Sequence, residues 1–448
     1  EMSEPPEQRL RLCILTEFFH PDSSGGTAVA MSSLARELHD SQGIEVAVVA
    51  GRHRYKGGDP WPARDDWDGI VIERIAAPDF NRAGVAKRTI GNLILTAKAG
   101  LKLTFGPRYD AILVSTAPPF LPMAASFAGR LRRTPFFYIV YDLEPDRVVG
   151  LGVMPPNSAF VKAMGYLQRR FVARAARVFA IGRDMLELLS ERHRMPAEKG
   201  VFVPVGAADP GCAETEWDDA PAGAPEEPLR VLYSGNLGRY HDFDTILDAA
   251  KILAPAGRVQ FTIVGDGAKR AAIEARLARE HIPNVTLRSL VPASEYGALL
   301  AGADVCLVTM ESGIEGTCVP SKFYSIIGSG KPVLGLVHPR SEVARAIEEE
   351  QCGFTVAQGD PRALVEVLSL ISEDRGRMKK IGKAGRKAFE RKYTIGTVAA
   401  RMAAEFRLIC RKTACSEEIA PSRTQLADAS GEGLSDDGPE NGTKNAVP

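Results

Sequence analysis

The feature that most constrains the fold is an alternation of short apolar runs with helical stretches along most of the chain. Seven runs in the first half are typical of buried strands, at 11–18, 45–51, 69–75, 111–116, 135–142, 177–182 and 201–206. Six more follow in the second half, at 230–236, 259–267, 284–291, 303–310, 331–337 and 352–358. Because strands that alternate with helices form βαβ units, the pattern predicts parallel sheets.

One internal segment interrupts this alternation. Residues 207–229 are rich in Ala, Pro, Gly and acidic side chains and have no periodicity, which predicts a linker. We therefore expect an α/β fold with two doubly wound, Rossmann-like domains, at 10–206 and 230–395. Ligands of such sheets bind beyond the carboxyl ends of the strands, so we expect the site in a cleft between the two domains.

The two ends of the chain differ from the rest. Residues 1–9 are polar and are expected to be a flexible N-terminus. Near the other end, helical periodicity breaks at about Tyr393, and we expect 396–414 to be a helix that crosses back to the first domain. Residues 415–448 carry seven acidic and two basic side chains and few apolar ones, which predicts a disordered acidic tail.

Composition excludes several classes of protein. The 56 Lys and Arg balance the 56 Asp and Glu, so no nucleic-acid partner is expected. The seven cysteines form no Cys-x-x-Cys pair, which argues against a zinc site or a disulfide framework and favours a reducing compartment. The chain has no apolar stretch of about 18 residues, and its first residues lack an apolar signal core, so neither a membrane span nor a signal peptide is expected.

The second half holds three candidate anion sites, each at a turn from a strand to a helix. The first turn carries Asn236, Arg239 and His241 close to a helix start, where backbone amides and a guanidinium can bind an anion. At the second, Gly265 permits close approach of a backbone or a ligand, although the following residues break the dinucleotide fingerprint and give no support to a nicotinamide dehydrogenase. At the third, Lys322 opens a helix. Plain turns and a solvated surface lysine are the alternatives.

The first half offers two further candidate groups. The Gly25-Gly26 turn lies between the first strand and the first helix, where backbone amides meet phosphate or sugar groups, although it is also compatible with a simple tight turn. Asp142 follows a strand and is suited to general-base or hydroxyl-binding work, with a solvated loop acid as the alternative. Glu315, in the polar loop before Lys322, is the matching acid of the second half.

Residues 82–108 combine basic charge with a helical apolar stripe. Their six basic side chains have no acidic neighbour in the segment, and the stripe consists of Ile90, Leu93, Ile94, Ala97, Leu101 and Phe105. A basic amphipathic helix indicates binding to a membrane surface. The alternative is a helix whose stripe faces the core and whose basic face is solvated.

The order of these motifs resembles that of the retaining nucleotide-sugar glycosyltransferases of family 4, which have the GT-B fold of two facing Rossmann-like domains. The resemblance runs from about residue 11 to 410 and is carried by the Gly-Gly turn, GNLGRYHDFDTILDAA, VGDG, ADVCLVTM, SGKPVLG, CGFTVAQGDPRAL and KAGRKAFERKYT. The GNLGR and PSKFY segments are similar to those of the subgroup that builds bacterial surface polysaccharides and O-antigens.

The resemblance implies roles for individual residues. Gly25, Gly26, Asn236 and Gly265 would line the donor, whereas Arg239, His241 and Lys322 would contact its diphosphate. Ser325 falls where many members have the second Glu of an E-x7-E motif, which binds the donor ribose; Thr317 lies eight residues earlier and Glu315 two residues out of register. Asp142, where the family often has His-Asp, and Glu315 would be the catalytic pair that orients hydroxyl groups.

The implied reaction is transfer of a sugar from a nucleotide diphosphate sugar to an acceptor hydroxyl with retention of anomeric configuration. Basic side chains would stand in for a metal, no cofactor is expected, and a UDP-sugar is favoured over a GDP-sugar. A lipid-linked saccharide or a polysaccharide precursor would be the acceptor, which implies a cytoplasmic enzyme, peripheral on the inner face of the cytoplasmic membrane. The alternatives are a sugar-nucleotide epimerase of the same architecture and a catalytically degenerate sugar-nucleotide-binding scaffold.

Overall fold

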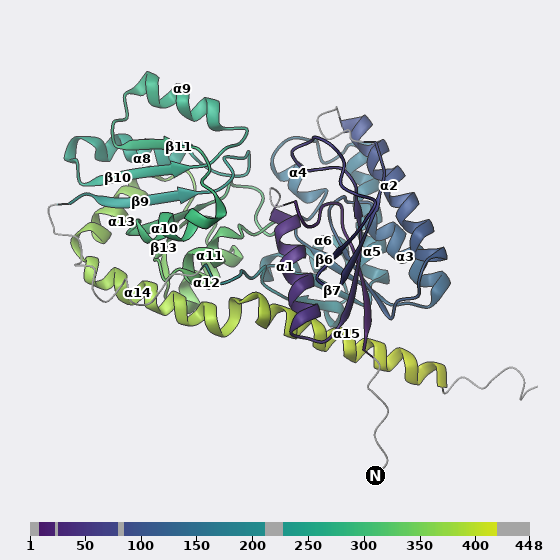
Figure 1. The fold of residues 1–448 in the computed structure, drawn as a ribbon. Helices are drawn as coiled ribbons and strands as arrows, with labels where there is room; N and C mark the ends of the chain where they lie inside the picture. The colour runs from purple at the N-terminus through teal and green to yellow at the C-terminus, as the bar shows by residue number, and fades with distance from the viewer. Residues whose placement is uncertain (1–8, 23–25, 79–84, 211–226, 419–448) are drawn as a thin grey trace, which may run out of the picture.

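The computed structural model describes residues 9–22, 26–78, 85–210 and 227–418. It shows two α/β domains side by side, with one long helical segment running beneath both (Figure 1). The expected flexible N-terminus (1–9), linker (207–229) and acidic tail (415–448) fall largely outside the described residues.

The N-terminal domain is built on an eight-stranded sheet of order β3-β4-β2-β1-β5-β6-β7-β8. Its strands are β1 (Arg11–Leu15), β2 (Glu45–Gly51), β3 (Arg64–Trp67), β4 (Ile70–Ile75), β5 (Ala111–Ser115), β6 (Phe136–Val140), β7 (Arg177–Ala180) and β8 (Gly200–Phe202). The helices are α1 (Gly26–Asp40), α2 (Val85–Phe105), α3 (Leu121–Arg132), α4 (Asp146–Gly150), α5 (Ala159–Arg174) and α6 (Arg183–His193).

The C-terminal domain has a six-stranded parallel sheet of order β11-β10-β9-β12-β13-β14. Its strands are β9 (Leu229–Ser234), β10 (Val259–Val264), β11 (Val285–Arg288), β12 (Val305–Thr309), β13 (Val333–Leu336) and β14 (Gly353–Val356). The helices around it are α8 (Asp244–Leu253), α9 (Arg270–Glu280), α10 (Tyr296–Ala301), α11 (Lys322–Gly328), α12 (Glu342–Glu350), α13 (Pro361–Glu373) and α14 (Arg375–Ala388).

The expectation of two doubly wound α/β domains with parallel sheets is confirmed. Every residue of β5, β6, β12 and β13 is buried, as in sheets that helices cover on both faces. The one departure is β3, which pairs antiparallel with β4 at the edge of the first sheet. Its sequence, RDDW, lacks the apolar run by which the other strands were found, and charge of this kind is usual on an edge strand.

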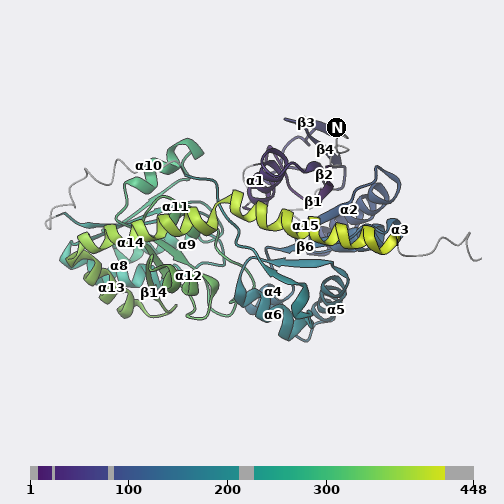
Figure 2. The same ribbon diagram turned by 90° about the horizontal axis from the view of Figure 1, so that it is seen from below.

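A C-terminal helix joins the two domains. After α14 a five-residue π turn ends at Tyr393, and α15 (Ile395–Glu418) then runs along the N-terminal domain, as Figures 1 and 2 both show. The ring of Phe406 packs edge-on against Phe137, with centroids 4.7 Å apart. Glu405 binds Arg177 at 2.8 Å.

A second contact between the domains joins α6 to the start of α12. The Arg183 guanidinium binds Glu342 through both carboxylate oxygens, at 2.9 and 3.0 Å, and the Asp184 carboxylate accepts the backbone N–H of Glu342 at 3.0 Å. Arg345 and Glu187 pair beside them at 2.8 and 3.0 Å. Glu342 is almost fully buried whereas Glu187 is more than half exposed, so the two ion pairs differ in their surroundings.

This difference generates a test of what holds the domains together. Arg183→Met leaves the buried Glu342 carboxylate without its charged partner, and we expect the free energy of unfolding to fall by about 3 kcal/mol. Arg345→Met breaks the exposed pair and should cost less than about 1 kcal/mol. Urea unfolding of both variants measures the two losses of free energy. Equal losses would show that the buried pair stabilises the protein no more than the exposed pair does.

Candidate functional site

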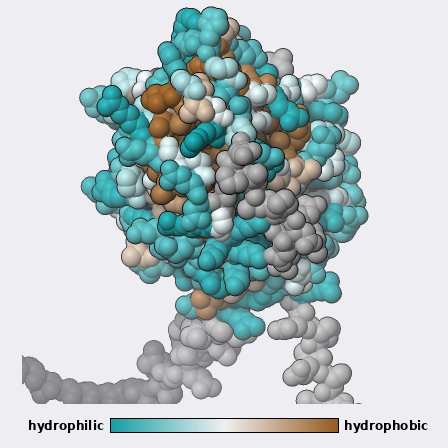
Figure 3. Space-filling view, turned by 90° about the vertical axis from the view of Figure 1, so that its left-hand side faces the viewer, coloured by the Kyte–Doolittle hydropathy of each residue, from teal (hydrophilic) through white to brown (hydrophobic). Residues whose placement is uncertain are grey.

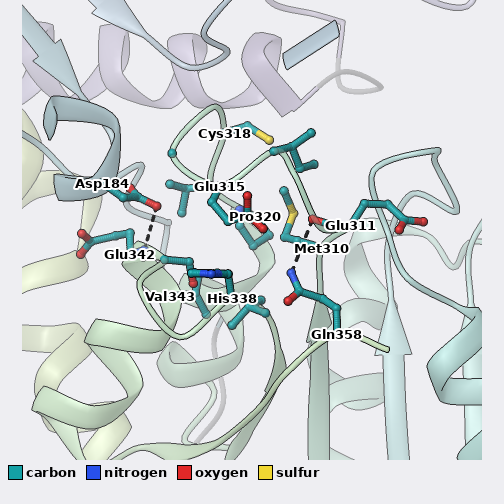
Figure 4. Close-up of a pocket in the computed structure, with 15 residues that line it drawn as sticks. Asp184, Met310, Glu311, Glu315, Cys318, Pro320, His338, Glu342, Val343 and Gln358 are labelled. Atoms are coloured by element: carbon teal, nitrogen blue, oxygen red, sulfur yellow. Dashed lines mark hydrogen bonds between the residues drawn. The ribbon is translucent and has the colours of Figure 1, made fainter. Parts of the chain in front are cut away.

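A pocket lies at the carboxyl ends of β12, β13 and β14 and is closed on one side by α6 of the other domain (Figure 4). It contains about 320 Å³ of empty space, part of it open to solvent. Its lining includes Asp184, Glu311, Ile314, Glu315, Cys318, Val319, Pro320, His338, Ser341, Glu342 and Gln358. Of the residues predicted from sequence, Glu315 lies in this lining.

Carboxylates dominate the polar lining of the pocket. Asp184 accepts backbone N–H groups from Met185 at 2.8 Å and Glu342 at 3.0 Å, and burial raises the pKa of its carboxyl to about 6. Glu315 accepts the N–H of Gly313 at 2.9 Å within its own loop. An acidic lining of this kind is suited to hydroxyl groups, which donate hydrogen bonds to carboxylates.

Lys322 is the first residue of α11, two residues after Pro320 of the pocket, and its side chain reaches the end of β9. Its ammonium donates to the Tyr233 hydroxyl at 2.5 Å and lies 3.8 Å from the centre of that ring. The hydroxyl in turn donates to the carbonyl of Asn236 at 2.7 Å. Burial lowers the pKa of Lys322 to about 7. The hydrogen-bond partner of this cation is therefore a neutral phenol, and within the described residues no carboxylate forms an ion pair with it.

His241 differs from the basic ligand that the sequence led us to expect. It is buried, and its Nδ1 donates to the carbonyl of Thr309 at 2.6 Å. Burial, with help from the positive charge of Lys322, lowers its pKa to about 3. A neutral imidazole brings no positive charge to the site, and donor binding by His241 stays a prediction.

Arg239 and Asn236 lie in the exposed part of the same turn. Among the described residues, the Arg239 side chain has no hydrogen bond or ion pair. The nearby Lys269 ammonium is occupied instead, since it pairs with Glu311 and donates to the His241 carbonyl at 2.8 Å. Arg239 is thus the guanidinium of this turn that is free to meet an anion.

Gly265 lies where two loops pack so closely that a side chain would not fit. A Cβ on this residue would stand 2.0 Å from the carbonyl oxygen of Gly235 and 3.0 Å from the Leu237 side chain. Gly267, at φ +153°, would similarly press on Asn236 and Leu237. The close approach that the sequence predicted at Gly265 is therefore made by the backbone of the turn after β9. A side chain at Gly265 or Gly267 would displace this turn.

The remaining predicted residues lie nearby or outside the described part of the chain. Gly26 is the first residue of α1, whereas Gly25 falls outside the described residues. Ser325 lies one turn after Lys322 on the same face of α11. Asp142 follows β6, binds Arg147 at 2.6 Å, and forms an isolated bridge with Cys318 of the other domain.

The structure adds three residues that sequence reasoning missed. Arg147 binds Asp142 and Glu144 and lies 5.0 Å from the centre of the Tyr240 ring across the domain boundary. Tyr233 holds Lys322, and Asp184 reaches the pocket from α6. Arg147 follows Glu144 by three residues, and this spacing, which favours an ion pair, is a signal in the sequence. Nothing local marks Asp184 or Tyr233, because their roles arise from contacts with distant segments.

An Asp-x-Asp triplet, Asp242-Phe243-Asp244, lies close to the site and bears on the expectation of metal independence. The buried Asp242 carboxylate accepts the N–H of Thr245 at 3.0 Å and its hydroxyl at 2.5 Å, so it caps the start of α8. Asp244 binds Arg276 at 2.8 Å. Within the described ranges, no three His, Cys, Asp or Glu side chains are grouped as ligands of a metal ion.

Comparison with family models covers both domains. Residues 25–206 match the glycosyl transferase 4-like domain, and residues 215–388 match the glycosyl transferases group 1. The chain belongs to the GT-B glycosyltransferases of family 4 type. The two matches together cover all of the second sheet, every strand of the first sheet except β1, and the pocket between the domains.

Curated relatives point to the same enzymes. The chain is 28% identical to a probable glycosyltransferase, WbjE of Pseudomonas aeruginosa, over 66% of this chain and 74% of that protein. It is 25% identical to WcaI of Escherichia coli, a putative colanic acid biosynthesis glycosyl transferase, over 43% of this chain and 48% of the relative.

Solved structures share the fold at low sequence identity. Sucrose-phosphate synthase of Thermosynechococcus elongatus superposes with a TM-score of 0.68 at 17% identity, covering 90% of this chain and 99% of that one. Anabaena HepE in complex with UDP and glucose gives 0.62 at 15% identity, covering 88% and 99%. These likenesses support the GT-B architecture.

The packing of Gly265 yields a test of the turn that carries Asn236 and Arg239. Gly265→Ala forces the β9 turn away from β10, and we expect it to cost about 2 kcal/mol of stability and to abolish stabilisation by UDP. Gly165→Ala is the matched control, because nothing lies within 4 Å of its Cβ position on α5. Thermal unfolding with and without UDP measures both effects. If UDP raises the melting temperature of Gly265→Ala as much as that of the control, the expected role of the turn after β9 in binding UDP is contradicted.

Proposed function

We propose that this glycosyltransferase transfers a sugar from a UDP-sugar to the hydroxyl of a lipid-linked saccharide, with retention and without a metal. The observation that carries the proposal is two cations without a carboxylate partner among the described residues, the exposed Arg239 after β9 and the part-buried Lys322 at the start of α11, near a pocket lined by carboxylates. The Anabaena HepE structures contain UDP or UDP-glucose, which supports the donor class, and WcaI is a putative colanic acid biosynthesis glycosyl transferase, which supports a saccharide acceptor.

The chemistry of the reaction assigns work to each group. As the glycosyl–phosphate bond breaks, negative charge grows on the leaving diphosphate, and fixed cations beside it stabilise that charge. Lys322 has a neutral hydrogen-bond partner, so the arriving diphosphate is the anion that compensates it. The amides at the start of α1, from Gly26 onward, add a further anion-binding element.

The acids of the site are assigned to hydroxyl groups. Glu315 stands in the pocket, and we assign it to the donor sugar. Asp142 lies where the two domains meet, and its pairing with Arg147 leaves a carboxylate oxygen for an acceptor hydroxyl. Transfer to a lipid-linked acceptor fits a cytoplasmic enzyme that works at the membrane surface. No helix in the described ranges is long and apolar enough to cross a bilayer.

Removing the buried cation tests the proposal directly. Lys322→Ala should lower the turnover of UDP-sugar at least about tenfold, because one charged contact to the leaving group is lost. Lys251→Ala, on the exposed face of α8, is the control and should leave turnover unchanged. UDP release from a panel of UDP-sugars with a bacterial lipid extract as acceptor is the measurement. If the wild type binds UDP but releases none, the scaffold alternative holds.

The pKa of Lys322 predicts the pH dependence. The ammonium is charged below its pKa of about 7 and neutral above it, so kcat/KM should fall as pH rises through 7, by about tenfold per pH unit at the steepest. Lys322→Arg keeps its charge at all these pH values and should lack this decline. A wild-type profile that stays flat between pH 6.5 and 9, measured by UDP release, would remove the assignment.

A further inference from the structure

The apolar stripe of α2 faces solvent. Ile90, Leu93, Leu101 and Phe105 are all exposed, and Phe105 retains 79% of its accessible surface. The core is served instead by Leu95, Ala99 and Leu103 on the opposite side of the helix. The alternative reading of this segment, a stripe directed at the core, is therefore wrong.

A second exposed stripe lies on the neighbouring helix α3. It consists of Met123, Phe127 and Leu131, spaced four residues apart, of which Phe127 and Leu131 are 59% and 58% exposed. The two helices are in contact, since Arg132 donates to the carbonyl of Thr104 at 2.5 Å. We call the seven exposed residues Ile90, Leu93, Leu101, Phe105, Met123, Phe127 and Leu131 the α2–α3 face.

The helices of and next to the α2–α3 face carry basic side chains and no acidic ones. The segments 85–108, 121–133 and 159–174, which hold α2, α3 and α5, contain twelve Lys and Arg and no Asp or Glu. Some of these charges are occupied, as in the pair of Lys102 with Glu73. Lys87, Arg88, Arg130 and Arg133 are exposed, with no ion pair among the described residues.

The face lies at the end of the N-terminal domain that points away from the C-terminal domain, as both ribbon views show (Figures 1 and 2). Both α2 and α3 follow strands of a parallel sheet, β4 and β5, so both helices begin at the carboxyl edge that carries Asp142. A surface that bound this face would extend toward the entrance of the site.

We propose that the α2–α3 face docks the enzyme on an anionic lipid bilayer. Exposed aromatic and aliphatic side chains enter the acyl boundary while the surrounding Lys and Arg contact acidic headgroups, which is the composition of interfacial helices. An acidic protein partner is disfavoured, because the face combines seven exposed apolar side chains with exposed Lys and Arg on the same two helices, which is the composition that an anionic bilayer surface binds. The inference rests on the proposed function only for the nature of the acceptor that the bilayer presents.

The C-terminal domain provides the matched control. Seen from its outer end, its surface is mainly hydrophilic, with apolar side chains gathered in the upper half (Figure 3). Three exposed apolar side chains of this domain are Ile252, Leu290 and Leu370, which retain 51%, 52% and 48% of their accessible surface. The helices α8 and α13 that carry two of them also carry acidic residues, which a negative membrane repels.

The test is flotation of the full chain with vesicles of phosphatidylglycerol and phosphatidylcholine. Wild-type protein should float with anionic vesicles, fail to float with pure phosphatidylcholine, and bind less as salt screens the headgroups. The variant Phe105→Ser, Phe127→Ser, Leu131→Ser should lose at least about tenfold in partitioning. Ile252→Ser, Leu290→Ser, Leu370→Ser should partition as the wild type does. Arg130→Gln, Arg133→Gln is a second variant that leaves the apolar side chains intact and should weaken binding on anionic vesicles.

Three results would overturn the inference. The first is no flotation of the wild type at low salt, and the second is equal flotation of the two triple variants. The third is a stable dimer of the wild type in light scattering that is lost only in the triple variant of the α2–α3 face. Stabilisation by UDP, measured by thermal unfolding, should be the same in all variants. Because flotation uses no sugar nucleotide and UDP binding uses no lipid, failure of the membrane surface and failure of the proposed reaction are separate outcomes.

Discussion

The structure depends on the meeting of two parallel sheets at their carboxyl edges. The Leu143 amide of one domain donates to the Thr317 carbonyl of the other at 2.7 Å, and the Arg183–Glu342 pair ties α6 to α12 a short distance away. Strand ends are where a parallel sheet leaves backbone groups unpaired and places its polar loops. Joining two such edges brings carboxylates of both domains around one pocket, which neither domain would form by itself.

Within that pocket region, the electrostatic arrangement follows from burial. Lys322 is placed against a tyrosine hydroxyl and ring, which satisfy its hydrogen bonding without neutralising it. The positive charge of Lys322 helps to lower the pKa of His241, so Lys322 is the cation of this pair of groups and His241 is neutral. Lys269, by contrast, is paired with Glu311. The site therefore concentrates its uncompensated charge on Lys322 and Arg239, where a diphosphate is expected.

Sequence alone predicts the fold well because the information is local. Runs such as 111–116 and 303–310 are buried on both faces and so must be apolar, whereas β3 escapes because its edge position tolerates charge. The site is harder to predict. The position of Lys322 could be foreseen, but its partner Tyr233 lies 89 residues away, and His241 loses its charge through neighbours that the sequence places far from it. Asp184 gains a place in the pocket only through the docking of two domains.

The helix α15 has a consequence for how the molecule is made. Its residues Ala399, Met402, Ala403 and Phe406 are buried, and the Phe406 ring packs against Phe137 and Phe179 of the N-terminal domain, although more than 190 residues of chain separate these partners. During translation the first domain leaves the ribosome long before α15, which covers part of it. Until α15 leaves the exit tunnel, the first domain presents an uncovered apolar surface, so it is completed only after the second domain has been synthesised.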